Sequence, residues 1–308
     1  MQISILLAQQ IAQLFLILIM GYAVVKAGLL KASDSKVLSV VMVYLVTPCV
    51  IINAFQINDT PEIRKGLLYS MAIAAAIHVV LLVLSALLSR PLKLDAVEQV
   101  NVIYSNAAAL VIPLVKALMG DAYVIYSCAF IIVQLVLLWT HASSLLQGSS
   151  ALDWKKVLTN INMIAIFAGV LLFLLQIQLP TPVQDAVDSI SSMVGPMGML
   201  ILGMLIAEMD LKKLMSYHRL WWITLLRLVG IPLIGIALLK YSGLAALVPE
   251  GRTILLVTLL AICTPSASTL TQMAQVYGKD ADYASAINVV TTLLCIVTMP
   301  LMVALYQM

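Results

Sequence analysis

Two stretches of the chain place proline and small polar residues inside long apolar segments. Residues 104–113 read Tyr-Ser-Asn-Ala-Ala-Ala-Leu-Val-Ile-Pro, and residues 261–269 read Ala-Ile-Cys-Thr-Pro-Ser-Ala-Ser-Thr. A proline inside a helix leaves the carbonyl four residues earlier without its donor and kinks or breaks the helix. In lipid such a break persists only where it lines a cavity or packs against protein. The two stretches therefore predict two interrupted helices that meet inside a membrane protein.

The composition around these stretches identifies the bilayer as the solvent. Of the 308 residues, 63% are hydrophobic and 10% are charged. From Ile3 to Val25 there is no acidic, basic or histidine side chain, and from Gly66 to Ser89 the only one is His78. Roughly 20 apolar residues suffice to cross a hydrocarbon core of about 30 Å. The chain is therefore expected to be an all-α integral membrane protein in contact with lipid, and a net charge of +3 gives no reason to expect a nucleic-acid partner.

Ten spans are expected, five in each half of the chain. Residues 1–150 form the first predicted repeat and residues 151–308 the second, and the longest connection falls between them. The predicted spans cover residues 3–25, 35–56, 66–89, 99–118, 121–146, 161–179, 185–208, 219–241, 252–276 and 282–306.

Lysine and arginine in the connections predict the orientation. With the N-terminus outside, the cytoplasmic connections carry 11 of the 17 Lys and Arg residues and the outer side carries 5. Cytoplasmic loops are enriched in these residues. Met1-Gln2 also lacks the basic start of a cleavable signal peptide. We therefore expect a multi-pass protein of the cytoplasmic (inner) membrane with a retained first span and both termini on the outer side.

Five spans per half is an odd number, so the second half must enter the membrane from the opposite side. Pro48 and Pro196 occupy the second span of their halves. Asn106 lies fourteen residues before Gly120, and Pro265 lies thirteen residues before Gly278. These corresponding positions in the two halves predict an inverted repeat in which the broken fourth and ninth spans cross near the membrane centre. Half-helix N-termini at such a crossing are partially positive and suit an anion.

Several motifs resemble the auxin efflux carrier family over essentially the whole chain. They are Gly21-Tyr22, Lys26-Ala27-Gly28-Leu29-Leu30, Tyr44-Leu45-Val46-Thr47-Pro48, Ser105-Asn106, Ile112-Pro113-Leu114, Pro265-Ser266-Ala267, Tyr277-Gly278, Ala284-Ser285 and Thr298-Met299-Pro300-Leu301. The resemblance implies a ten-helix fold with crossed spans 4 and 9, similar to that of sodium/proton antiporters. It also implies transport of auxin-like acids or of carboxylates such as malonate and malate, and a homodimer. Plant members often have Pro-Asn where this chain has Ser105-Asn106, and their long cytoplasmic loop is missing here.

The candidate substrate-binding residues are polar groups within the spans. They are Ser105, Asn106, Thr264, Pro265 and Ser266 at the crossing, with Asn53, Gln134, Asn288 and Arg227. The predicted crossover or hinge positions are Pro48, Pro113, Pro196 and Pro265.

Arg227 and His78 each allow two interpretations. Arg227 is the one basic residue well inside a span, where a guanidinium is costly, by about 2.5–3.5 kcal/mol on insertion scales. It either attracts a substrate carboxylate or extends toward the cytoplasmic interface near Trp221 and Trp222. His78 either relays protons or makes a structural hydrogen bond within the bundle.

These features favour a secondary carrier of a small organic anion that works by alternating access. The absence of an aspartate pair within the spans argues against a cation/proton antiporter, while coupling to protons or sodium stays open. A sodium-coupled symporter of the bile-acid type and a membrane sensor that binds a metabolite without moving it are the alternatives. The sequence has no HExxH, GxSxG, Walker A or GxGxxG motif and no CxxC pair, so we expect no enzyme activity, no cofactor and no metal.

Overall fold

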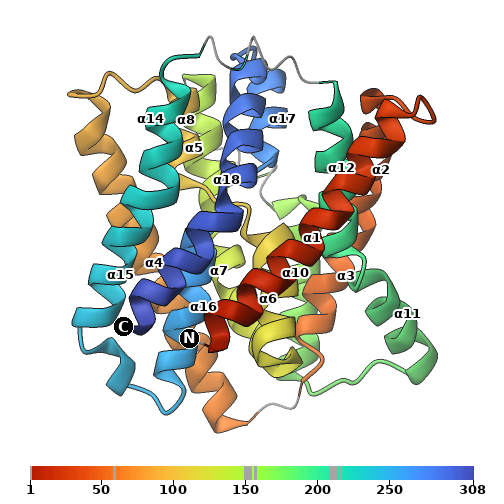
Figure 1. The fold of residues 1–308 in the computed structure, drawn as a ribbon. Coiled ribbons are helices and arrows are strands. Elements are labelled where there is room, and N and C mark those ends of the chain that lie inside the picture. The colour runs from red at the N-terminus through yellow and green to blue at the C-terminus, as the bar shows by residue number, and fades with distance from the viewer. Residues whose placement is uncertain (1, 58–59, 149–154, 156–157, 209–213, 215–216) are drawn as a thin grey trace.

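The protein is helical throughout the part of the chain that the structure, a computed structural model, describes (Figure 1). That part comprises residues 2–57, 60–148, 155, 158–208, 214 and 217–308. Within it, six helical segments are long and apolar enough to cross a membrane, and four shorter apolar helices accompany them. Each predicted span contains helix, interrupted in several of them, and this confirms an α-helical membrane protein.

The first half of the chain supplies eight of the labelled helices. They are α1 (Gln2–Lys26), α2 (Ser35–Val41), α3 (Thr47–Ala54), α4 (Pro61–Ser89), α5 (Ala96–Ile103), α6 (Ala107–Met119), α7 (Val124–Leu137) and α8 (Ser143–Gln147). The second half supplies the others. They are α10 (Ile161–Leu174), α11 (Thr181–Ser191), α12 (Val194–Ala207), α14 (Leu220–Leu225), α15 (Ile231–Tyr241), α16 (Gly251–Cys263), α17 (Thr269–Val276) and α18 (Ala281–Gln307).

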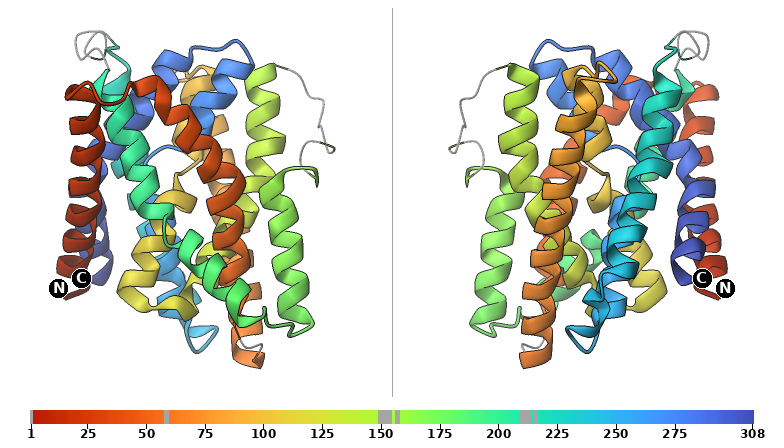
Figure 2. Two further views of the ribbon diagram at one scale, coloured as in Figure 1. Left: turned by 90° about the vertical axis from the view of Figure 1, so that its right-hand side faces the viewer. Right: turned by 90° about the vertical axis from the view of Figure 1, so that its left-hand side faces the viewer.

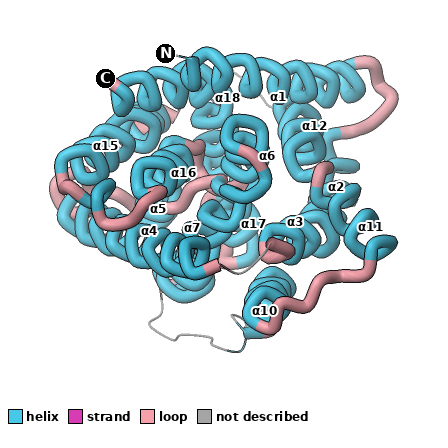
Figure 3. The backbone as a smooth tube through the Cα atoms, turned by 90° about the horizontal axis from the view of Figure 1, so that it is seen from below, coloured by secondary structure: helices cyan, strands magenta, loops and turns pink. Residues whose placement is uncertain are grey.

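The helices form two bundles that lie side by side (Figures 2 and 3). The flanking bundle consists of α1, α2, α3, α10, α11 and α12, and in it α1 packs along α12. The crossing bundle consists of α4 to α8 and α14 to α18. The bundles meet where α6 packs against α1 and α12 and where α18 packs against α1. Both chain termini lie at the same end of the molecule.

Glycines bring α1 and α12 into backbone contact. A Cβ at Gly203 would lie 2.0 Å from the Leu18 carbonyl oxygen, and a Cβ at Gly21 would lie 2.3 Å from the Leu200 carbonyl oxygen. Small residues allow this close approach between membrane helices, where van der Waals packing supplies much of the association energy. The two glycines therefore fix the contact on which the flanking bundle is built.

The prolines that were predicted as hinges behave in different ways. Pro265 lies in an extended break between α16 and α17, as a crossover residue should. Pro48 opens α3 directly after a π-helical turn, Met42–Val46, and α2 and α3 remain joined there. That turn shifts the hydrogen-bond ladder, so the chain accommodates a missing donor without separating the two helices.

Pro113 and Pro196 are not breaks in this structure. Pro113 lies inside the continuous helix α6. The interruption of this span lies earlier, between the end of α5 and the start of α6. Pro196 is in the first turn of α12, where the proline lacks an N–H that the helix does not need. The interruption in that span lies just before it, between Ser191 and Val194.

Candidate functional site

Two interrupted helices cross near the middle of the crossing bundle. The crossing is defined here as residues 104–106, between α5 and α6, and residues 264–268, between α16 and α17. Ser105 and Ser266 form an antiparallel bridge. The Asn106 N–H donates to the Pro265 carbonyl at 2.8 Å, and the Ala267 N–H donates to the Tyr104 carbonyl at 3.1 Å. The two breaks thus supply hydrogen-bond partners for some of each other's backbone N–H and carbonyl groups.

Side-chain amides and hydroxyls hold the two serines at the bridge. Gln134 of α7 accepts hydrogen bonds at Oε1 from the Ser105 N–H at 3.0 Å and from its hydroxyl at 2.8 Å, and its Nε2 donates to the Ser105 carbonyl at 2.8 Å. Asn288 of α18 donates to the Ser266 carbonyl at 2.6 Å, and the Ser266 N–H donates to the Thr291 hydroxyl at 3.2 Å. The Ser266 hydroxyl donates to Asn101 Oδ1. Each half of the chain therefore uses its last span, Val124–Gln147 or Ala281–Gln307, to fix its own broken segment.

Arg227 lies in the π-helical turn Leu226–Gly230, fully buried against the crossing. Its Nε and Nη2 donate to the Thr264 carbonyl at 3.2 and 2.8 Å, and Nη2 also donates to Ile262 at 3.1 Å. Its Nη1 donates to the carbonyls of Val102 at 3.1 Å and Ile103 at 3.4 Å. The guanidinium thus bonds the carbonyl ends of both α5 and α16, where the helix dipoles are negative.

These contacts contradict an extension of Arg227 toward the interface and show how its donors are used in this conformation. A side chain with 0% exposure does not extend toward the membrane interface. A guanidinium has five N–H donors, and the five contacts above use backbone carbonyls. In this conformation no donor is left for a substrate carboxylate. The positive charge of Arg227 nevertheless lies next to the residues of the crossing.

The opposite, N-terminal ends of the half-helices are more open. Asn106 caps α6 without a side-chain hydrogen bond to it, and its amide makes none to any residue that the structure describes. Asn106 is partly exposed and Ser268, at the start of α17, is exposed. The side chains that follow Asn106 are small, at Ala107, Ala108 and Ala109. This arrangement places polar groups and small side chains at two partially positive helix ends.

The predicted site residues fall into two places. Ser105, Asn106, Thr264, Pro265 and Ser266 form the crossing, and Gln134, Asn288 and Arg227 contact it. Asn53 is engaged elsewhere, because its amide nitrogen donates to Asp188 at 3.0 Å and to Ser191 at 3.2 Å on α11. Asp188 also pairs with Lys116 of α6 at 3.5 Å, so this second cluster joins the flanking and crossing bundles.

Sequence analysis missed an ionic cluster at the start of α5. Glu98, whose side chain is 2% exposed, accepts hydrogen bonds from Arg219 at 2.6 and 2.7 Å and from the Tyr283 hydroxyl at 3.0 Å. The hydrogen bonds with Glu98 raise the pKa of Arg219. The pattern Asp95-x-x-Glu98 forms a capping box and could have been read from the sequence. Its partners, 121 and 185 residues away, could not.

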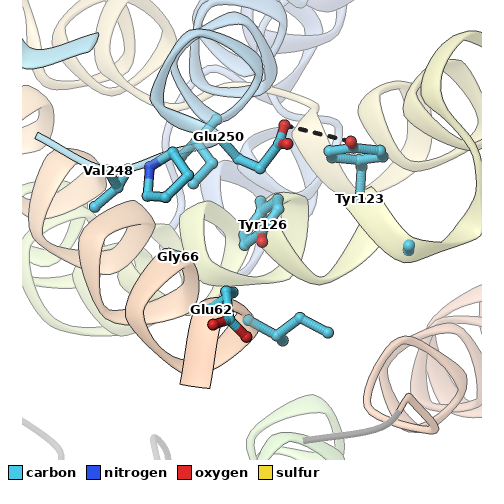
Figure 4. A pocket seen from close by; sticks show the side chains of 10 residues that line it. Glu62, Gly66, Tyr123, Tyr126, Val248 and Glu250 are labelled. Atoms are coloured by element: carbon cyan, nitrogen blue, oxygen red, sulfur yellow. Dashed lines mark hydrogen bonds between the residues drawn. The ribbon is translucent and has the colours of Figure 1, made fainter. Parts of the chain in front are cut away.

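A separate hollow of about 180 Å³ opens near the start of α4 and α16 (Figure 4). Glu62, Tyr123, Tyr126 and Glu250 line it, and the Tyr123 hydroxyl donates to Glu250 at 3.3 Å. Burial and the neighbouring Glu250 carboxylate raise the pKa of Tyr123. The α16 helix runs 13 residues, roughly 20 Å, from this end to the crossing. The hollow is therefore distinct from the crossing.

Comparison with known proteins decides the family. The family described as membrane transport protein matches residues 6–153 and 145–303, which together span nearly the whole chain. The chain belongs to the auxin efflux carrier family of membrane transport proteins. A comparison with curated proteins found no match. Membership confirms that the chain is a multi-pass membrane transporter, in a family of transporters and not of enzymes.

Proposed function

We propose that this transporter is a secondary carrier that moves a small organic anion across the cytoplasmic membrane by alternating access. The observation that supports it is the division of the crossing into two kinds of helix end. The carbonyl ends of α5 and α16 are bonded by Arg227, while the N-termini of α6 and α17 remain available. The substrate class that fits is a mono- or dicarboxylate such as malonate, malate or an auxin-like acid.

Electrostatics at the crossing favour negative charge. Each helix N-terminus carries the equivalent of roughly half a positive elementary charge. Arg227 adds a full charge, and residues 99–115 and 253–278 contain no aspartate or glutamate. In a low-dielectric interior such charges act strongly on a ligand. An anion is therefore the ligand that this field stabilises, with Asn106 and the Ser268 hydroxyl as its hydrogen-bond donors.

The two halves of the chain, residues 1–150 and 151–308, supply the moving parts in this proposal as inverted repeats. Each half has a break at the crossing, and in each half an amide side chain, Gln134 or Asn288, donates to the carbonyl of the serine in that break. These correspondences support the relation between the halves. The crossing bundle would move against the flanking bundle, with both termini on the outer side of the inner membrane. Inverted repeats provide two equivalent states through such a motion.

Uptake into liposomes tests the proposal. Purified protein would be reconstituted, and entry of labelled malonate, malate and indole-3-acetate measured with and without an imposed proton or sodium gradient. Asn106→Ala would be compared with Asn162→Ala, a control on α10 in the flanking bundle. Saturable uptake of one acid is expected for the wild type and the control, with a loss of about tenfold or more for Asn106→Ala, the effect of one good hydrogen bond to a charged group.

Two results would count against the proposal in different ways. If folded wild-type protein moves none of the three acids under any gradient, carboxylate transport is excluded as its function. If an acid is moved equally well by Asn106→Ala, the function stands and the site at the crossing is wrong.

A further inference from the structure

Buried polar atoms without hydrogen-bond partners lie along the two helices α4 and α7. They are His78 Nε2 and Ser85 Oγ on α4 and Ser127 Oγ on α7. The three side chains are 0%, 3% and 1% exposed. Buried polar groups nearly always have partners, and an exception calls for a functional explanation. His78 is the one of the three whose side chain can bind a proton and become charged.

The hydrogen bond that His78 does make fixes its tautomer. Its Nδ1 lies 2.7 Å from the Ala74 carbonyl oxygen. Since a carbonyl only accepts, Nδ1 carries the proton and Nε2 presents a lone pair. The imidazole packs on the Phe130 ring with centroids 4.7 Å apart. A basic nitrogen with a lone pair is thus held in the buried interface between α4 and α7.

Gln134 connects this nitrogen to the crossing. Gln134 lies one helical turn after Phe130, on the face of α7 that packs against the imidazole. A proton on Nε2 requires an acceptor, and Gln134, one turn beyond the ring that packs on the imidazole, offers the amide oxygen of its side chain. That oxygen already accepts from the N–H and the hydroxyl of Ser105. Its two lone pairs are in use, so a protonated His78 competes with Ser105 for the same atom.

We propose that His78 is the proton-binding site of the carrier, and that its protonation loosens the Gln134 clamp on Ser105 and so couples proton movement to the crossing. This inference rests on the transport function proposed above. Ser127 lies toward the end of α7 that carries the hollow, and Ser85 lies two turns beyond His78 on the same face of α4. The two hydroxyls mark a route for the proton on either side of the imidazole.

Arg227 is a fixed charge that acts on His78 from another helix, and the charged side chains of α4 itself, Glu62, Arg64 and Lys65, lie in its first two turns. The helices packed against α4 are α5, α7 and α16. Their titratable groups are Glu98, bonded to Arg219 in the first turn of α5; Tyr126 and Cys128 of α7; and exposed Arg252 and buried Cys263 of α16. Arg227 repels a proton at His78, so binding of a carboxylate at the crossing favours protonation by offsetting that charge. Acid and proton are thereby expected to move together.

Proton movement measured beside acid exchange tests this inference. Liposomes containing a pH dye would take up labelled malonate, malate or indole-3-acetate, and exchange of labelled for unlabelled acid would be followed at equal pH. The variants are His78→Asn, which keeps a donor for the Ala74 carbonyl, His78→Gln, and the control His218→Asn near the start of α14. Loss of the titrating nitrogen is expected to reduce acid-dependent proton movement about tenfold, a typical coupling between two sites. Exchange should change less than about twofold, and His218→Asn should match the wild type.

Each other outcome overturns the inference. Wild-type proton movement in His78→Asn removes His78 as the site. Acid flux by the wild type without proton movement removes proton coupling and leaves the carrier intact. Loss of exchange in both His78 variants would make the imidazole structural. Absence of flux in the wild type itself would show that the proposed function fails, and the inference with it.

Discussion

Arg227 shows how one residue can place a positive charge beside the crossing while its donors bond backbone carbonyls. It bonds four carbonyls that belong to two different helices, and so joins the ends of α5 and α16. The sequence indicated that this residue was important, because a basic side chain inside a span needs partners. It did not indicate which partners, because backbone carbonyls carry no sequence signature. For the same reason Gln134 and Asn288 could be predicted as polar residues near a cavity but not as clamps on Ser105 and Ser266.

Replacing Arg227 should destabilise the protein in a graded way. Arg227→Met leaves four buried carbonyls without their donor, at about 1–3 kcal/mol each. Arg227→Lys keeps the charge but offers only three donors from one atom, so its loss of stability should be smaller. Thermal unfolding of the protein in detergent should rank wild type above Arg227→Lys and Arg227→Lys above Arg227→Met. Arg252→Met, at an exposed site, should resemble the wild type. Equal unfolding temperatures for all four proteins would contradict the role assigned to Arg227.

At the scale of helices, the lengths of the apolar runs were sufficient to predict where helix occurs. The breaks were harder to place, as the fourth and seventh spans show. The sequence predicted a crossing at Ser105 and Asn106 and a further hinge at Pro113, and the chain breaks only where Ser105 and Asn106 find backbone partners in the other half. Proline signals only the cost of continuing a helix, whereas a break also needs partners for the freed groups. The π-helical turns before Pro48 and Pro232 were not predicted, because they change the hydrogen-bond ladder without changing the composition.

Filling the contact between α1 and α12 should weaken the flanking bundle. Gly203→Ala puts a methyl group where the backbone of α1 lies, and overpacking of this kind costs about 1–3 kcal/mol. The matched control is Gly198→Ala, on the same helix, whose Cβ would have its nearest neighbour at 3.5 Å. We expect a lower unfolding temperature in detergent for Gly203→Ala and little change for Gly198→Ala. The packing would be wrongly described if the two variants unfolded alike.

At the scale of the whole molecule, the distribution of Lys and Arg and the odd number of spans per half predict an inverted pair of repeats. The structure places both termini at one end, and the breaks of the two halves meet at one crossing. The side of the membrane on which each end lies remains a prediction from the charge distribution. The geometry of the crossing could be anticipated only in outline, since it depends on contacts between segments about 160 residues apart.

Cysteine labelling in intact cells tests the orientation. Leu247→Cys and Leu29→Cys replace two leucines with 67% and 75% exposure in connections at opposite ends of the molecule. If the termini are outside, a membrane-impermeant maleimide should label Leu247→Cys in intact cells and Leu29→Cys only after permeabilisation. Of the four native cysteines, three are buried and Cys49 is partly exposed, so the unmodified protein supplies the background. The reverse pattern of labelling would invert the proposed topology.

The most direct test of an anion site at the crossing is uptake of the transported acid by Asn106→Asp. This change keeps the shape of the side chain and places a negative charge at the N-termini of α6 and α17. If the crossing binds an anion, uptake should fall by at least about a hundredfold, because a like charge at a binding site costs several kcal/mol, while unfolding in detergent should show that the protein remains folded. Uptake by folded Asn106→Asp at the wild-type rate would contradict the account, because no anion could then be bound beside that residue.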